Sequence, residues 1–355
     1  MDISRVLGTA AGVALFIPLL AGCGGTAPPV VVRLPTLAAT ADASALRSVP
    51  FGSPTPTASP VATLPTITPL PTATPLIPTA TPGPTPVALA TPTADPARQI
   101  NGIPFEQIAV IPPNVAEHMA QIAKQGQELG RDPHTFSKIG DSAVLIESNL
   151  TRFDNGPLDL GPYSFLEPTI SYFAQSWERY GAGARVSLTA IGTLDPMWAN
   201  PAYCSPGENL LACEIRLNNP SILLIRLGTN DGSADLYHTY MSQIIEYALD
   251  NGIVPILGTK ADRFEGDDSI NEATRQLAAA YRVPLWDFDA VAATLPNRGL
   301  TDDHAHLSVY RRNDYTDPET YQRGYPMSDL SALVALDAVR EIMFPDASAV
   351  ESSEP

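Results

Sequence analysis

The sequence of this 355-residue chain predicts an α/β domain built on a five-stranded parallel sheet. Five short runs rich in Val, Ile and Leu lie between residues 136 and 289, and each runs into Gly, Asp or Asn. Helical patterns lie between and after them. Strands that alternate with helices favour a parallel sheet with helices on both faces.

The strands are predicted first, because their apolar runs are the clearest signals. They cover residues 136–141, 185–191, 221–228, 252–258 and 283–289.

Three helices follow from apolar residues at helical spacing. The clearest pattern, over residues 240–252, has Met241, Ile244, Ile245 and Ala248 on one face and stops at Gly252. Residues 270–282 and 328–344 show similar patterns.

The first part of the chain has a different composition. Of the 36 prolines, 17 lie between residues 24 and 96, where only Arg33, Asp42, Arg47 and Asp95 are charged. Such a segment buries too little apolar surface to fold. We therefore predict a disordered Pro/Thr-rich tether over residues 23–97, a folded domain over residues 98–345 and a disordered tail over residues 346–355.

Residues 1–22 are typical of a secretory signal peptide. The apolar run after Arg5 is shorter than the roughly 20 residues needed to span a bilayer. It ends in Leu20-Ala21-Gly22-Cys23, which resembles a bacterial lipobox, in which the cysteine receives the lipid. We expect Cys23 to anchor an extracytoplasmic protein to its membrane. The alternatives are an uncleaved anchor and a plain secretory signal.

The formal net charge is −17, and nearly all of it lies on the predicted domain. An acidic surface repels phosphate backbones, so we expect no nucleic-acid partner.

Polar side chains follow three of the predicted strands. Ser142 comes directly after the first, Asn230 after the third, and residues 300–308 (LTDDHAHLS) after the last. Sites in parallel sheets gather at the carboxyl ends of the strands. A serine, an amide and an acid–imidazole pair at one edge are the groups that acyl transfer needs.

The three blocks GDS, GTND and DHAHLS, in this order, resemble the SGNH (GDSL-like) hydrolase family over about residues 130–345. The resemblance implies a flavodoxin-like α/β/α sandwich. It also implies Ser142 as nucleophile, His306 as general base, Asp303 as its partner, and oxyanion donors from the Ser142 backbone and Asn230. The activity implied is a serine ester hydrolase that works through an acyl-enzyme and needs no metal or cofactor.

The second block of the family is not clear in this sequence. The family places a glycine after the second strand, and the nearest candidate here, Gly192, comes late. Ser187 is the alternative at the equivalent turn.

Two other interpretations of these residues remain open. The run from Asp302 to His306 has the residue types of a metal site. The domain could also bind a carbohydrate or another ligand without catalysis, because fold alone does not imply activity. On the main interpretation we expect a monomer that hydrolyses a glycan or small-molecule ester.

Cys204 and Cys213 are the cysteines left after Cys23. Two remaining cysteines in an exported chain favour a disulfide between them. The alternative is two free buried thiols.

Overall fold

A computed structural model describes residues 98–345, except residues 147, 148 and 180. The predicted signal peptide, the Cys23 anchor, the tether and the tail therefore lie outside the described residues.

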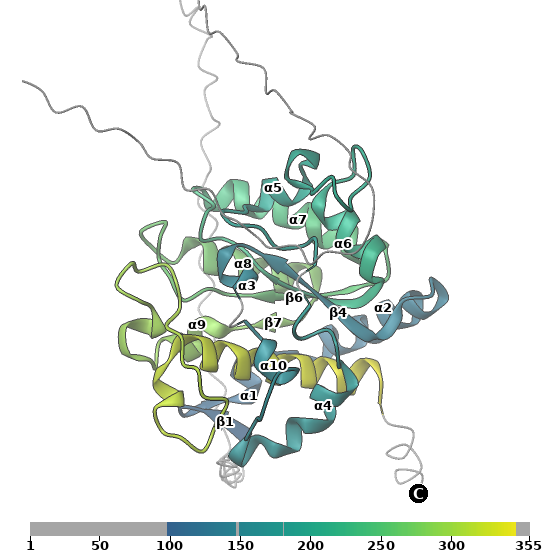
Figure 1. The fold of residues 1–355 in the computed structure, drawn as a ribbon. Coiled ribbons are helices and arrows are strands. Elements are labelled where there is room, and N and C mark those ends of the chain that lie inside the picture. The colour runs from purple at the N-terminus through teal and green to yellow at the C-terminus, as the bar shows by residue number, and fades with distance from the viewer. Residues whose placement is uncertain (1–97, 147–148, 180, 346–355) are drawn as a thin grey trace, which may run out of the picture. The chain divides into compact units, whose positions relative to one another are not determined.

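The central sheet has five strands in the order β3-β7-β6-β5-β4 (Figure 1). These are β3 (Ala109–Val110), β7 (Leu285–Trp286), β6 (Val254–Gly258), β5 (Pro220–Arg226) and β4 (Asp132–Gly140). The strands β4 to β7 are parallel, and β3 is antiparallel to β7. The predicted α/β class is confirmed, with one antiparallel edge strand. A separate hairpin pairs β1 (Gln99–Ile100) with β2 (Ile103–Pro104).

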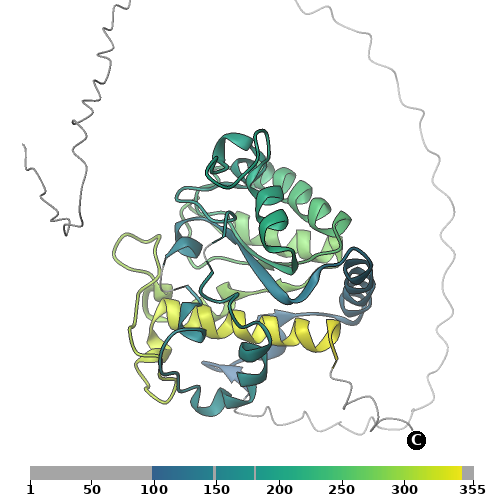
Figure 2. The same ribbon diagram turned by 45° about the vertical axis from the view of Figure 1, so that its right-hand side comes forward.

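Helices cover both faces of the sheet, which makes three layers (Figures 1 and 2). One face packs against α1 (Phe105–Ile108), α2 (Pro113–Glu128), α4 (Glu167–Tyr172), α9 (Phe288–Ala292) and α10 (Gly324–Met343). The other packs against α5 (Ala190–Leu194), α6 (Leu210–Asn218), α7 (Ala234–Asp250) and α8 (Ser269–Tyr281). The short α3 (Ser142–Leu145) follows β4. Single 3-10 turns lie at Thr151–Phe153, Gly161–Leu166, Pro196–Trp198, Pro296–Gly299 and Thr320–Gln322.

The alternation of side chains along β5 explains why the strand is apolar throughout. Ile222 and Leu224 pack on the α10 face, whereas Leu223 and Ile225 pack on the α7 face. A strand buried on both faces reads as one continuous apolar run.

The three predicted helices are confirmed as α7, α8 and α10. All three begin earlier than predicted, α8 by one residue and α7 and α10 by several. The Ser233 hydroxyl accepts the Leu236 N–H and starts α7 there. Pro326 lies in the first turn of α10, where the missing N–H costs nothing.

The predicted strand at residues 185–191 is wrong. Only Ala184 pairs with β4, in a single parallel bridge to Gly140. The chain then leaves the sheet because Ser187 adopts a left-handed conformation, with φ of 60°. Thr189 next caps α5 by accepting the Gly192 N–H. The bridge lies on the outer side of β4, where the flavodoxin-like order 2-1-3-4-5 places its second strand.

Cys204 and Cys213 form a disulfide, as predicted, with their Cα atoms 5.4 Å apart. The alternative of two free thiols is wrong. A structural disulfide suggests an extracytoplasmic location.

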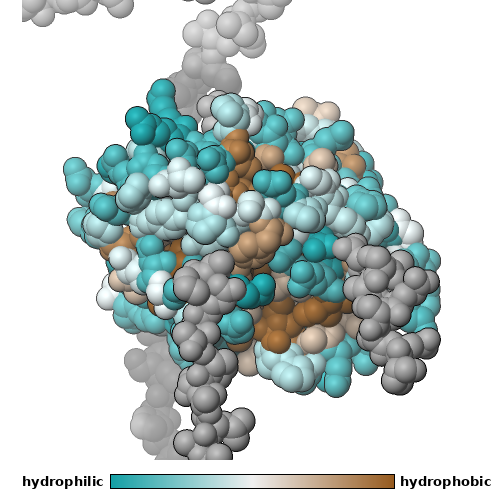
Figure 3. Space-filling view, turned by 90° about the horizontal axis from the view of Figure 1, so that it is seen from below, coloured by the Kyte–Doolittle hydropathy of each residue, from teal (hydrophilic) through white to brown (hydrophobic). Residues whose placement is uncertain are grey.

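Among residues 98–345, outside the three gaps, no helix combines the length and the apolar character needed to cross a bilayer. The face seen in Figure 3 is largely polar, with small apolar patches between polar side chains.

Candidate active site

The turn from β4 into α3 explains the Gly-Asp-Ser triplet. Gly140 lies so close to β5 that an added Cβ would meet the Arg226 carbonyl oxygen at 2.6 Å. Asp141 caps α3, because its carboxylate accepts the Ala143 N–H at 2.9 Å. Burial raises the pKa of the Asp141 carboxyl. Ser142 is thereby the first residue of a helix at the carboxyl end of the sheet.

The structure brings Ser142, His306 and Asp303 into direct contact. The Ser142 Oγ lies 3.1 Å from the His306 Nε2. The other ring nitrogen, His306 Nδ1, lies 2.6 Å from the Asp303 Oδ2. The three residues thus form a continuous hydroxyl–imidazole–carboxylate chain, although Ser142 and His306 are 164 positions apart.

A tight turn after residue 300 positions His306. The Thr301 N–H donates to the His306 carbonyl oxygen at 2.8 Å. Asp303 accepts the N–H groups of His306 (2.9 Å) and Ala305 (3.0 Å) and the hydroxyl of Thr301 (2.7 Å). These bonds, the His306 N–H foremost, lower the pKa of the Asp303 carboxyl well below its usual range. Asp303 is therefore ionised at any ordinary pH.

Asp303, and not the adjacent Asp302, contacts the imidazole of His306. The side chains of His306 and Asp303 are 47% and 51% exposed, whereas Ser142 is half-buried. The site is therefore open to solvent and to a bulky substrate.

Asn230, which follows β5, lies beside the turn that bears Ser142. Its Nδ2 donates to the Asp141 Oδ2 at 3.2 Å and to the Leu188 carbonyl oxygen at 3.4 Å. The amide thus sits next to Ser142, and its role as an oxyanion donor stays a prediction.

Of the two candidates for the third donor, Ser187 has the more suitable conformation. The Gly192 N–H already donates to the Thr189 hydroxyl at 3.1 Å. Ser187 is exposed, takes the left-handed conformation that glycine adopts most easily, and makes no backbone N–H bond within the described residues. The N–H of Ser187 is therefore the one available to a ligand.

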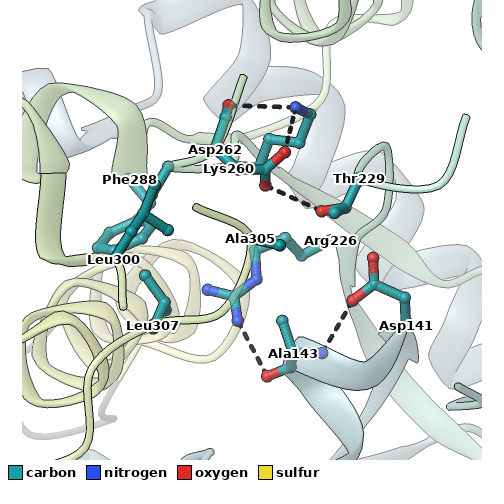
Figure 4. A pocket seen from close by; sticks show the side chains of 11 residues that line it. Asp141, Ala143, Arg226, Thr229, Lys260, Asp262, Phe288, Leu300, Ala305 and Leu307 are labelled. Carbon is teal, nitrogen blue, oxygen red and sulfur yellow. Dashed lines mark hydrogen bonds and ion pairs between the residues drawn. The ribbon is translucent and has the colours of Figure 1, made fainter. Parts of the chain in front are cut away.

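Arg226, the last residue of β5, supports the helix that begins at Ser142. Its guanidinium donates to the Ser328 hydroxyl (2.6 Å) and to the Ala143 carbonyl oxygen (3.2 Å). It also lies 5.2 Å from the ring centre of Trp286. Figure 4 shows the guanidinium between Ala143 and the loop that bears Ala305 and Leu307.

The neighbouring strand ends are joined by a polar network that the sequence did not reveal. Thr229 donates to Asp262 at 2.9 Å, and Asp262 pairs with the buried Lys260 at 2.8 Å (Figure 4). Because these residues follow β5 and β6, the network keeps the two strand ends in register next to the site.

Asp231 fixes the segment that replaces the predicted second strand. Its carboxylate accepts the Ala190 N–H at 3.0 Å. Only 8% of Asp231 is exposed, and burial raises its pKa to about 6. Its position next to Asn230 in GTND is a sequence signal that could have identified it.

The run from Asp302 to His306 does not bring three metal-ligating side chains together. Within the described ranges, the group that does so is Cys204, Glu208 and Cys213, and its two cysteines are bonded to each other.

No family model matches this chain, and no curated protein matches it. Solved structures that resemble it include a psychrotrophic esterase from Pseudoalteromonas sp., at 11% identity and a TM-score of 0.32, covering 62% of this chain and 99% of the esterase. A GDSL-like lipase from Bacteroides thetaiotaomicron has 15% identity, a TM-score of 0.35 and coverages of 64% and 98%. An acetylxylan esterase from Geobacillus stearothermophilus has 14% identity, a TM-score of 0.32 and coverages of 59% and 93%. Identities and TM-scores this low establish neither family nor activity for this chain.

Proposed function

We propose that this domain is a serine ester hydrolase that acts outside the cytoplasm. The observation that carries the proposal is the contact chain from the Ser142 hydroxyl through the His306 imidazole to the Asp303 carboxylate. Such a chain makes a serine hydroxyl nucleophilic by giving its proton a basic acceptor.

In the first half-reaction, His306 Nε2 takes the Ser142 proton while Oγ attacks the carbonyl carbon of the ester. We expect the resulting tetrahedral oxyanion to accept the Ser142 backbone N–H, the Ser187 N–H and the Asn230 amide, which would exchange one of its present bonds to Asp141 and Leu188 for the oxyanion. When the intermediate collapses, the bond to the leaving oxygen breaks and His306 returns the proton to the departing alcohol. Ser142 then carries the acyl group.

In the second half-reaction, water takes the place of the alcohol. His306 removes a proton from the water, and the hydroxide attacks the acyl carbon. The acid leaves, and Ser142 regains its proton from His306. Asp303 holds the imidazole in the tautomer that presents its free Nε2 to Ser142 and stabilises the imidazolium as it forms.

We further propose that Cys23 carries lipid and that the Pro/Thr-rich tether holds the domain at a distance from its membrane. LAGC at the end of the apolar run supports the lipid anchor. The Cys204–Cys213 disulfide supports export.

The proposal is tested on the exported protein with a chromogenic acetyl ester and a fluorophosphonate that labels activated serines. We expect turnover, and a covalent adduct that mass spectrometry locates on Ser142. The matched control is Ser205→Ala, which removes an exposed serine on the disulfide loop and should change neither result.

The alternative of a non-catalytic binding domain predicts the opposite outcome. A folded protein that neither turns over esters nor reacts with the fluorophosphonate would contradict the hydrolase proposal.

A further inference from the structure

An open cleft of about 730 Å³ is lined by residues that follow the two segments bearing Ser142 and His306. One wall is formed by Ile146, which follows α3, and by residues that include Arg152 and Asn155. The facing wall is formed by residues 309–311 and 313, which follow His306. A cleft of this volume is in the usual range for small-molecule sites.

Backbone and side-chain bonds hold the two walls together. The Asn313 Nδ2 donates to the Asn155 carbonyl oxygen at 3.3 Å. The Asp159 N–H donates to the Asn313 carbonyl oxygen at 2.8 Å, and the Tyr315 N–H donates to the Asp159 carbonyl oxygen at 2.7 Å. The cleft is therefore shaped before any ligand binds.

The lining of this cleft differs in charge from the rest of the chain. The chain has 38 acidic and 21 basic residues, yet among the residues that the structure describes the cleft is lined by Arg152 and Arg311 and by no Asp or Glu. Polar groups from Asn155, Asn313 and Tyr310 make up much of the remaining lining.

The charge of the buried arginine of the cleft is balanced by a buried carboxylate. Arg152 is only 6% exposed, and its Nε pairs with the Asp329 Oδ2 at 2.7 Å. Its Nη1 is buried and has no hydrogen-bond partner among the residues that the structure describes. Arg152 is therefore part of the frame of the cleft and adds no net charge to it.

The exposed arginine carries the net positive charge. Arg311 makes no ion pair with any residue that the structure describes. Its neighbour Arg312 pairs with Asp317 at 3.0 Å, and Asp317 also accepts the Tyr310 hydroxyl at 2.6 Å. Of the two adjacent arginines, Arg311 is thus the one free to bind an anion.

The position of the cleft indicates which half of an ester it holds. His306 must return its proton to the departing alcohol, so the alcohol lies on the His306 side of Ser142. The wall that bears Arg311 begins three residues after His306. Asn230, the proposed oxyanion donor, follows β5 and lies against Asp141.

We propose that this cleft binds the alcohol half of an ester whose alcohol is a carboxylate-bearing sugar. Arg311 pairs with the carboxylate, and the amide and phenol groups bind sugar hydroxyls. This inference rests on the proposed ester hydrolase function and names its substrate class.

Turnover is measured with acetylated glucuronic acid and with its methyl ester, in which the carboxylate is blocked and the acetyl group is unchanged. The ratio of the two kcat/KM values cancels any general damage to the enzyme. We expect the parent to favour the free acid by about five- to tenfold, as a charge-assisted hydrogen bond at a partly exposed site provides. The ratio should fall to about one in Arg311→Ala and below one in Arg311→Glu.

The matched control is Arg312→Ala, which removes the same charge one residue away and should keep the parent's ratio. An equal loss in Arg312→Ala, or a preference that survives in Arg311→Ala, would overturn the assignment.

Binding of the same two compounds to Ser142→Ala, measured by calorimetry, separates this inference from the proposed function. Selective binding of the free acid that Arg311→Ala abolishes supports the cleft even if the parent turns over neither ester, which would refute only the hydrolase. Equal or absent binding of both compounds refutes the substrate class.

Discussion

The two halves of the candidate site are held in place by different means. Ser142 belongs to a buried turn, in which Gly140 packs against β5 and Asp141 and Arg226 are only 2% and 5% exposed. Asp303 and His306 lie on an exposed turn that is fixed by hydrogen bonds within six residues.

Because of this difference, changes in the two halves should affect activity and stability differently. A change on the exposed turn removes little buried surface, so it should lower activity and leave the free energy of unfolding nearly unchanged. A change in the buried turn that bears Ser142 disturbs the core and should lower both the activity and the free energy of unfolding. The four predictions below test this contrast.

The largest effect is expected for His306→Ala. The loss of the base should lower kcat/KM for a chromogenic acetyl ester by at least about 10⁴-fold. The thermal unfolding midpoint should stay within a few degrees of the parent. His304→Asn is the control, because His304 is exposed on the same turn at φ of 59°, a conformation that asparagine tolerates. Comparable losses in both variants would argue against His306 as the base.

Asp303→Asn should have the next largest effect on activity. An amide cannot hold the His306 tautomer as the carboxylate does, so kcat should fall by severalfold to about 10⁴-fold. Asp302→Asn should cost little, because Asp302 does not bond the imidazole. If Asp302→Asn proves the more damaging change, the assignment of the acid is wrong. Loss of turnover on chelation, with recovery on adding metal, would support the metal alternative.

Arg226→Met tests the buried half. The change leaves the Ala143 carbonyl oxygen with the Tyr325 hydroxyl as its remaining side-chain donor and removes the bond to Ser328. We expect a loss of about 2–4 kcal/mol in the free energy of unfolding, together with lower activity. Denaturant titration and ester turnover measure the two effects. If Arg226→Met lost activity but kept the parent's free energy of unfolding, the buried half would behave like the exposed half and the contrast would be wrong.

Asp231→Asn should change the pH dependence of stability. The folded-state pKa of Asp231 is raised to about 6 by burial, so the folded state binds a proton more tightly than the unfolded chain. Stability from this group is present below about pH 4 and is lost as the pH rises to about 6, by about 2–3 kcal/mol in total. Urea titrations across this range should show a flatter dependence in the variant than in the parent.

Asp303 provides the contrast to Asp231, because its pKa is lowered. Its contribution to stability is present above the pKa of the unfolded chain and is lost only as the pH falls below about 4. Between pH 4 and pH 6, Asp303→Asn should therefore leave the dependence of the free energy of unfolding on pH unchanged. If Asp231→Asn and Asp303→Asn changed this pH dependence equally, burial would not be what distinguishes the two carboxylates.

The parts of the fold that sequence predicted are those with long, regular patterns. The strands β5 and β6 are continuous apolar runs that are buried on both faces. The helix α7 has apolar residues at helical spacing over several turns. The two-residue strand β3 has no such pattern and was missed. The run at residues 185–191 has the composition of a strand, but Ser187 turns it away from the sheet.

The sequence by itself determined which residue types stand at the carboxyl ends of the strands, because strand boundaries and the order of Ser142, Asn230 and His306 are local features. It also determined the cysteine pair, which is bonded in the structure. Only the tertiary structure decided what these residues contact. Arg226 is a charged residue in an otherwise apolar run, and the structure shows that it is the last residue of β5 and bonds to Ser328 and Ala143. Likewise, the 3.1 Å approach of Ser142 to His306 joins residues 164 positions apart, and packing of the whole sheet is what closes such a distance.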